Sequence, residues 1–178
     1  MTKASAAPPA RLHHEFGPLC DERSRVLILG SFPSVKSRAQ QFYYGHPQNR
    51  FWKVLAAVLG APVPQTVPEK KTLLLSHGVA LWDVIESCEI TGSSDASIRE
   101  VKVNDLNGLL ARCPQIAAIY VNGQTAYRYY EKYARPLCGR DAVPLPSTSP
   151  ANAAWSLERL IGAWGVIGEA ASDNRKPS

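Results

Sequence analysis

Residues 43–52, with the sequence YYGHPQNRFW, are dense in side chains that hydrogen-bond or stack. Pro47 suits the first position of a helix, which would place Asn49 in the first helical turn. A carboxamide there lies at the positive end of the helix dipole, where it can orient a water molecule or contact a ligand. The alternative for Asn49 is a local hydrogen bond to the backbone. Tyr44 offers a ring face on which a nucleobase can stack, or else covers the core.

Two further segments carry groups that suit a ligand. Residues 30–34, GSFPS, form a turn of mostly small residues whose backbone N–H groups can face a ligand. Residues 147–152, STSPAN, form a stiff loop whose hydroxyl and N–H groups suit contact with phosphate. A plain strand-to-loop turn is the alternative for the first segment, and a helix cap or Ser/Thr turn is the alternative for the second.

Strands and helices alternate along the chain. Short apolar runs predict strands at 25–30, 79–84, 116–121 and 142–146, and the prolines of the last run place it at a sheet edge or strand end. Helical patterns cover 47–60, 68–77, 104–112, 124–133 and 153–164. This alternation predicts an α/β fold with a parallel sheet covered on both faces. Ligands in such folds bind outside the carboxyl ends of the strands, where the polar segments fall.

The composition is that of an ordinary globular chain. We expect a flexible N-terminal segment over 1–20, a single domain over 21–170 and a flexible tail over 171–178. No apolar run approaches the roughly 20 residues that span a bilayer, and no secretory signal is visible, so we expect a cytoplasmic protein without a membrane partner. The net charge of +5 fits a polyanionic partner. The four cysteines form no CxxC pair, so we expect reduced thiols and no metal site.

The segments GSFPS, YYGHPQNRFW and LPSTSPAN, in this order and spacing, resemble the signature segments of the uracil-DNA glycosylase superfamily. The stretch HPQNRFWKVL is very similar to the mismatch-specific uracil glycosylases. The STSPAN loop and the doubled tyrosine more closely resemble the hypoxanthine-DNA glycosylase family, the sixth of the superfamily. The resemblance covers about residues 24–165. It implies a three-layer α/β/α sandwich with a central four-stranded parallel sheet. It also implies a monomeric, cofactor-free enzyme of base excision repair that flips a base out of DNA and hydrolyses its N-glycosidic bond with water.

The chain departs from the common superfamily pattern at two places. Most members carry Asp or Asn as the third residue of the first motif, where it positions the attacking water, but Phe32 stands here. The second motif usually contains a histidine that stabilises the departing base, but residues 147–149 are Ser-Thr-Ser. Both absences are characteristic of the hypoxanthine family, in which an asparagine of the HPxN segment is expected to supply the catalytic amide. That asparagine is Asn49.

The same resemblance implies the remaining site residues. Substrate contacts are expected from Gly30, Ser31, Phe32, Pro33, Tyr44, His46 and Asp83. DNA contacts are expected from Ser147, Thr148, Ser149, Pro150, Ala151 and Asn152, and residues 150–153 would fill the gap left by the flipped nucleotide. The base would stack on Tyr44, with Phe32 on its other side. Lys36, Arg38 and Arg50 are candidates for phosphate contact, with solvated surface charge as the alternative.

Asp83 matches a position where uracil-specific relatives carry an asparagine that reads the base edge. An ionised carboxylate accepts hydrogen bonds but does not donate them, so Asp83 can take the N1–H of hypoxanthine. It would also repel negative charge on the departing base, which leaves a protonated Asp83 as one alternative. A helix cap or loop acid without base contact is another.

Several functional alternatives remain open at this point. One is a uracil- or mismatch-directed glycosylase, against which Phe32 and the missing histidine count. Another is a nucleic-acid binding module without catalysis. A lysine Schiff base is disfavoured because no lysine of the signature segments is suitably placed. An unrelated nucleotide-binding protein is disfavoured because the phosphate fingerprints GxGxxG and GxxxxGK[ST] are missing.

Overall fold

The structure is a computed structural model, and it describes residues 10–90 and 98–172. A four-stranded sheet lies at its centre, with strand order β3-β2-β6-β7 and every neighbouring pair parallel. Its strands are β2 (Val26–Gly30), β3 (Val79–Asp83), β6 (Ala118–Asn122) and β7 (Val143–Leu145). The proline-containing strand β7 forms one edge, as its sequence predicts.

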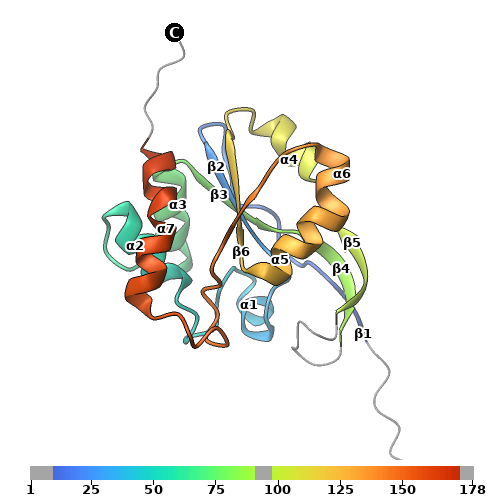
Figure 1. Cartoon of the computed structure of the whole chain (residues 1–178), viewed down its shortest axis with the longest axis horizontal. Helices are drawn as coiled ribbons and strands as arrows, with labels where there is room; N and C mark the ends of the chain where they lie inside the picture. Colours follow the sequence, from blue (N-terminus) through green and yellow to red (C-terminus); the bar gives the residue numbers. More distant parts are fainter. Residues whose placement is uncertain (1–9, 91–97, 173–178) are drawn as a thin grey trace, which may run out of the picture.

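Helices cover both faces of this sheet (Figure 1). They are α1 (Val35–Gln40), α2 (Phe51–Leu59), α3 (Val67–Ser76), α4 (Leu106–Arg112), α5 (Gln124–Tyr129), α6 (Arg135–Cys138) and α7 (Leu157–Ala171), and the π-helical turn η2 (Tyr130–Ala134) joins α5 to α6. Helices α2, α3 and α7 lie on one side, and α4, α5 and α6 lie on the other. The expected α/β/α sandwich with a four-stranded parallel sheet is confirmed. In the described ranges, no helix has the length and apolar character needed to cross a membrane.

The central strands form because their residues are apolar on both faces. Every residue of β2 and β3 is buried, which is typical of a parallel sheet covered by helices on both sides. On one face, Phe51 of α2 meets Trp164 of α7 edge to face, with ring centroids 5.9 Å apart, and neither side chain is exposed. Burial of a large apolar side chain contributes about 1.5–3 kcal/mol. This packing fixes the start of α2 against the sheet.

A second, antiparallel sheet was not anticipated from the sequence. It has the order β1-β4-β5 and consists of β1 (Ala10–His13), β4 (Ile85–Ile90) and β5 (Arg99–Val103). Farther along the chain, Leu19 exchanges two backbone hydrogen bonds with Leu81. The expectation of a flexible segment over 1–20 therefore does not hold for residues 10–14, which pair with β4, or for Leu19, which pairs with β3.

Two helices begin later than the sequence predicts. Helix α2 starts at Phe51 rather than at Pro47, because Pro47 lies in a turn closed by a hydrogen bond from Asn49 N to His46 O. Helix α7 starts at Leu157 rather than near residue 153, because the Ser156 side chain caps it by accepting from the backbone. Helix α7 also extends to Ala171, slightly into the expected tail.

Candidate active site

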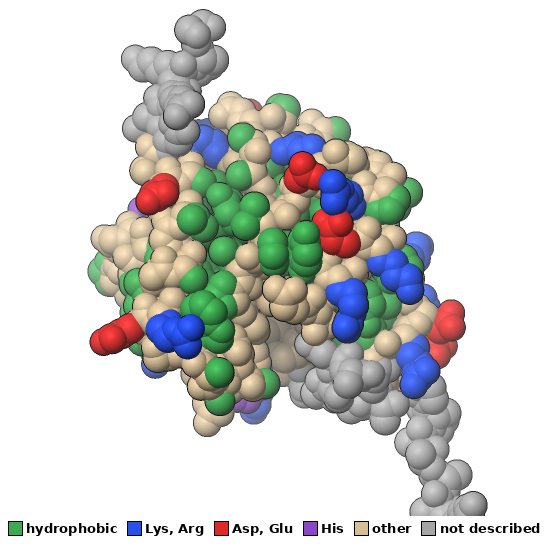
Figure 2. Space-filling model, in the orientation of Figure 1, with side chains coloured by type: hydrophobic (Ala, Val, Ile, Leu, Met, Phe, Trp, Pro, Cys, Tyr) green, Lys and Arg blue, Asp and Glu red, His purple; other side chains and the backbone are tan. Residues whose placement is uncertain are grey.

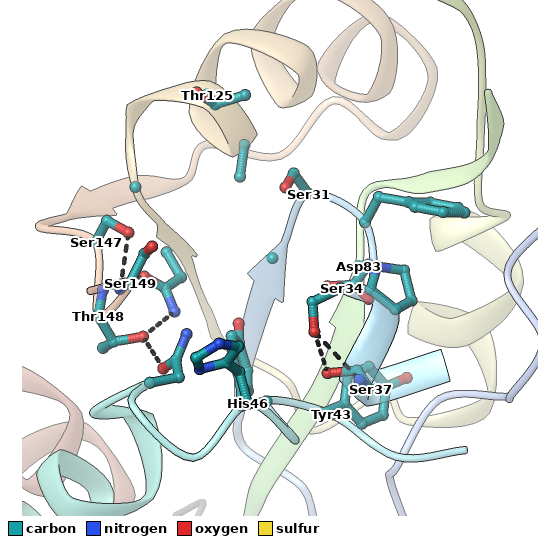
Figure 3. A pocket seen from close by; sticks show the side chains of 18 of the residues that line it. Ser31, Ser34, Ser37, Tyr43, His46, Asp83, Thr125, Ser147, Thr148 and Ser149 are labelled. Atoms are coloured by element: carbon teal, nitrogen blue, oxygen red, sulfur yellow. Dashed lines mark hydrogen bonds between the residues drawn. The ribbon is translucent and has the colours of Figure 1, made fainter. Parts of the chain in front are cut away.

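A cavity of about 540 Å³ opens at the carboxyl ends of the central strands, between α1 and the loop that follows β7 (Figure 3). Its size is in the usual range for small-molecule sites. It is lined by residues of the three polar segments and by Asp83, Asn122 and the start of α5. The expected catalytic, substrate-contact and DNA-contact residues all line it except Asn152, while of the three candidates for phosphate contact only Arg38 does. Asn152 instead donates its amide to Ser147 O within the loop, at 3.0 Å.

Gly30 ends β2 where two functional groups approach the backbone. A Cβ atom at this position would lie 2.9 Å from the Tyr44 hydroxyl and would overlap Asp83 Oδ1. Gly30 O and Ser31 O also accept hydrogen bonds from the backbone at 84 and 85, which ties β2 to the β3–β4 junction. Glycine is therefore required so that the carboxylate and the phenol can reach the end of the strand.

Asn49 lies just before α2, with its side chain fixed from two directions. Its Oδ1 accepts from Phe51 N at 3.0 Å and from Thr148 Oγ1 at 2.8 Å. Because a backbone N–H can only donate, the side-chain atom facing it must be the oxygen. Nδ2 makes no hydrogen bond to the described residues, so Asn49 offers the cavity a donor. Asn49 thus accepts the local hydrogen bond from the Phe51 backbone and also lines the cavity.

Thr148 holds this arrangement from inside the protein. Its side chain is fully buried, its hydroxyl accepts from Asn122 Nδ2 at 3.0 Å, and its N–H donates to Asn122 Oδ1 at 3.1 Å. The same hydroxyl donates to Asn49, so β6, the loop after β7 and the start of α2 share one hydrogen-bond chain (Figure 3). The Thr148 hydroxyl is consequently not at the surface, contrary to the expected DNA contact.

Arg50 also differs from its expected role at phosphates. Its guanidinium donates to Ser149 O at 2.9 Å, to Asn152 O at 3.1 Å and to Trp155 O. It therefore acts as a clamp on the loop after β7. Serine hydroxyls stabilise the same loop as Ser/Thr turns, since Ser149 N donates to Ser147 Oγ and Ala151 N to Ser149 Oγ. Pro150 and Ala151 remain exposed at its tip.

Tyr44 packs one face of its ring on Phe51, with centroids 3.9 Å apart and planes inclined by 18°. Its backbone has a φ of 52°, an uncommon conformation for a residue with a side chain. Burial and the negative charge of Asp83 raise the pKa of the Tyr44 hydroxyl. The nearby Asn122 side chain lowers this pKa by a smaller amount. Tyr44 is therefore a neutral phenol at ordinary pH.

Sequence reasoning missed a residue behind Asp83. His14 Nε2 and Asp83 Oδ2 lie 2.8 Å apart, with side-chain exposures of 2% and 6%. His14 follows β1, and its backbone N–H donates to Glu86 O at 2.6 Å. The two residues are 69 positions apart, and His14 falls in the segment expected to be flexible, so no local pattern could reveal the pair.

The other expected residues are placed more simply. His46 lines the cavity while its Nδ1 accepts from Gln48 N at 3.1 Å. Phe32 lies partly buried, with the Arg38 guanidinium 6.0 Å from its ring centre, and Arg38 also lines the cavity. Lys36 is exposed. Pro33 is buried at the cavity wall.

The described residues contain no cluster of three or more His, Cys, Asp or Glu side chains placed to hold a metal ion. All four cysteines are free thiols. Cys88 and Cys113 are buried, while burial and the neighbouring Cys113 raise the pKa of Cys20 to about 11. A thiol with such a pKa is a poor nucleophile. Cys20 is thus not a candidate nucleophile.

The fold and the cavity define an α/β/α protein with a cavity of about 540 Å³ at the carboxyl edge of its parallel sheet. The family model of the uracil DNA glycosylase superfamily matches residues 17–165, and the chain belongs to this superfamily. A protein of Methanosarcina acetivorans named Hypoxanthine DNA glycosylase is 37% identical over 145 residues, covering 81% of this chain and 90% of that protein. A protein of Methanosarcina barkeri with the same name is 32% identical over 151 residues, covering 84% of this chain and 93% of that protein. A solution NMR structure from M. acetivorans aligns with a TM-score of 0.75 and 33% identity, covering 88% of this chain and 96% of that one.

Proposed function

We propose that this chain is a monofunctional DNA glycosylase that hydrolyses the N-glycosidic bond of a deaminated base, most specifically hypoxanthine, flipped out of DNA. The observation that carries the proposal is the fixed Asn49 amide, whose oxygen is held by Phe51 and Thr148 and whose nitrogen is left for the cavity. The names of the two Methanosarcina relatives support the choice of hypoxanthine.

Base flipping brings the target nucleotide from the DNA helix into the cavity, at a cost of a few kcal/mol that is lowest for a mismatched base. The exposed tip at Pro150 and Ala151 is placed to enter the space that the nucleotide leaves. Arg50 and the serine turns keep the tip rigid, so its insertion requires little ordering. Other groups would then contact the phosphates. Lys36 and Arg38 both lie on α1, and Arg38 also lines the cavity.

The surface offers further cations for a polyanion. In Figure 2 the Lys and Arg side chains gather on the right of the face shown, where Figure 1 places α5, α6 and β5. Arg99 and Arg128 are exposed there, as are Lys102, which pairs with Glu86, and Arg135, which pairs with Glu131 and Asp141. Neutralising several phosphates releases counterions, so binding to DNA would weaken as salt increases.

Within the cavity, Tyr44 stacks on the base with its free ring face while Phe51 supports the other face. The C1′–N9 bond then breaks with oxocarbenium character, and a water oxygen forms the new bond to C1′. Asn49 Nδ2 donates to that water and holds it below the sugar, while Oδ1 stays bonded to Phe51 and Thr148. One proton of the water ends on the released base or in solvent, and an abasic sugar remains in DNA.

The direct test uses purified protein and short duplexes that carry one hypoxanthine, uracil or xanthine, with alkali to reveal abasic sites. Asn49→Ala is compared with Gln48→Ala, a change at the adjacent exposed side chain. Cleavage at hypoxanthine that collapses in Asn49→Ala and persists in Gln48→Ala supports the proposal. Cleavage mainly at uracil would place the chain among the uracil-directed enzymes, and DNA binding without base release would leave a binding module. The monomeric state and cytoplasmic location remain predictions.

A further inference from the structure

The buried pair of His14 and Asp83 takes no part in the cleavage step described above. The two side chains come from different sheets, since Asp83 ends β3 and His14 follows β1. Backbone hydrogen bonds fix both residues, with His14 N donating to Glu86 O at 2.6 Å. The 2.8 Å contact between Nε2 and Oδ2 therefore joins two rigid positions.

His14 uses only one of the two carboxylate oxygens. Asp83 Oδ1 lies at the Gly30 edge of the cavity, as the overlap with a Cβ on Gly30 indicates, and among the described residues it has no hydrogen-bond partner. A carboxylate held through one oxygen presents the other in a defined direction. The cavity therefore contains an oriented acceptor at the wall formed by the ends of β2 and β3.

Of the two ring nitrogens of His14, only Nε2 has a hydrogen-bond partner among the described residues, because aromatic rings surround the imidazole. Its ring centre lies 4.7 Å from that of Phe16, 6.0 Å from that of Tyr43 and 6.2 Å from that of Phe32. Nδ1 is enclosed and has no hydrogen-bond partner within the described part of the chain. Because a buried carboxyl group is costly unless it is hydrogen-bonded, the contact with His14 Nε2 compensates the burial of Asp83.

We propose that His14 is a positioning residue that holds Asp83 as an ionised acceptor, so that the cavity selects bases with a lactam N–H and rejects adenine. The inference rests on the proposed function and names the recognition element of that same site. Deamination of adenine turns N1 from an acceptor with a lone pair into an N–H donor. Facing Asp83 Oδ1, hypoxanthine forms a charge-assisted hydrogen bond, whereas adenine places a lone pair against an anion.

The pair of His14 and Asp83 contributes to the selection of the base and not to the rate at which the glycosidic bond breaks. A carboxylate opposes negative charge that grows on the departing base, so its contribution lies in binding the correct base and excluding adenine, the most abundant close analogue. Uracil and xanthine carry an equivalent N–H and pass this criterion. Guanine and thymine carry it too, so the pair does not account for their exclusion.

The experiment compares binding to duplexes that contain the 2′-fluoroarabino analogues of deoxyinosine and deoxyadenosine, which resist cleavage, together with single-turnover release of hypoxanthine. His14→Leu removes the donor, His14→Gln keeps an N–H at nearly the same reach, and His13→Leu is the control at the neighbouring exposed residue. His14→Leu is expected to lower the preference for inosine over adenosine by about 10- to 150-fold, the value of a hydrogen bond to a charged group. His14→Gln should restore most of the preference, and His13→Leu should leave it unchanged.

Asp83→Asn provides a second route if His14→Leu does not fold. Its amide can turn a donor toward N1, so the preference for inosine over adenosine is expected to fall at least tenfold. A folded His14→Leu or Asp83→Asn with the wild-type preference would overturn the inference. Because the preference is measured by binding, it is read even if the wild-type protein releases no base, which would instead count against the proposed function.

Discussion

Replacing Asn49 by aspartate separates the two things that this side chain does. The carboxylate retains an oxygen for Phe51 N and Thr148 Oγ1, the two bonds of 3.0 and 2.8 Å, but it loses the Nδ2 donor. Because the donor positions the attacking water, its loss should cost about 10²-fold in rate, the effect of misplacing a reacting group by about 1 Å, or about 2.7 kcal/mol. The retained bonds keep the loop and the start of α2 in place, so stability should change little. Alanine would remove both bonds and cost about 1–3 kcal/mol of stability as well.

The assay is single-turnover cleavage of a deoxyinosine duplex, run beside thermal melting of each variant. Asn49→Asp is expected to cleave at least 100-fold more slowly than the wild type while its melting temperature stays within a few degrees. Gln48→Glu adds the same charge at the adjacent exposed side chain and should cleave nearly as fast as the wild type. A rate for Asn49→Asp within threefold of the wild type would refute the reasoning, because donation by Nδ2 would then be unnecessary.

Three further changes test the surrounding structure. Thr148→Val removes the buried hydroxyl between Asn122 and Asn49, so stability should fall by about 1–3 kcal/mol and the cleavage rate about tenfold. Thr148→Ser keeps a hydroxyl and should recover both. Equal losses in the two variants would show that the hydroxyl does not position Asn49. Arg50→Gln removes the loop clamp, so DNA affinity should fall with an unchanged slope of log affinity against log salt; a slope reduced by about one would mean that Arg50 does neutralise a phosphate. Burial raises the pKa of Tyr44 above that of an unfolded tyrosine. The neutral Tyr44 phenol therefore contributes to the stability of the folded protein below about pH 10, and this contribution is lost as pH rises further. The melting temperature of the wild type should therefore drop more steeply from pH 9 to pH 11 than that of Tyr44→Phe, and parallel curves would contradict this.

The central layer of the fold was predictable because its strands are local and unambiguous. The run VLILG of β2 is apolar at nearly every position, and a buried parallel strand is the simplest structure for it. The strand–helix alternation then determines which ends of the strands meet, so the polar segments at 30–34 and 147–152 were correctly expected at one edge.

The second sheet was not predictable by the same means. Strand β5, REVKV, is largely polar and exposed, and β1 has four residues, so neither carries a strong period-two pattern. Their stability comes from pairing with β4, which immediately follows β3 and merges with it in sequence. Such pairing between distant segments is invisible to local propensity.

Within the site, residue types were predictable but partners were not. Asn49, Thr148 and Arg50 were each identified as functional side chains, yet the sequence could not indicate that Thr148 bonds Asn49 or that Arg50 binds the loop carbonyls 99 to 105 residues away. The start of α2 was misplaced because Pro47 fits a turn as well as a first helical position. His14 was missed altogether, since its role depends entirely on Asp83.

The most direct test of the central claim is to identify what the purified protein releases from a deoxyinosine duplex. We expect free hypoxanthine, detected by mass spectrometry, and a DNA strand that stays intact until alkali is added. Hypoxanthine should be released faster than uracil from a matched duplex, and adenine should not be released. Release of uracil alone, or strand cleavage without alkali, would contradict the account of a monofunctional glycosylase directed at hypoxanthine.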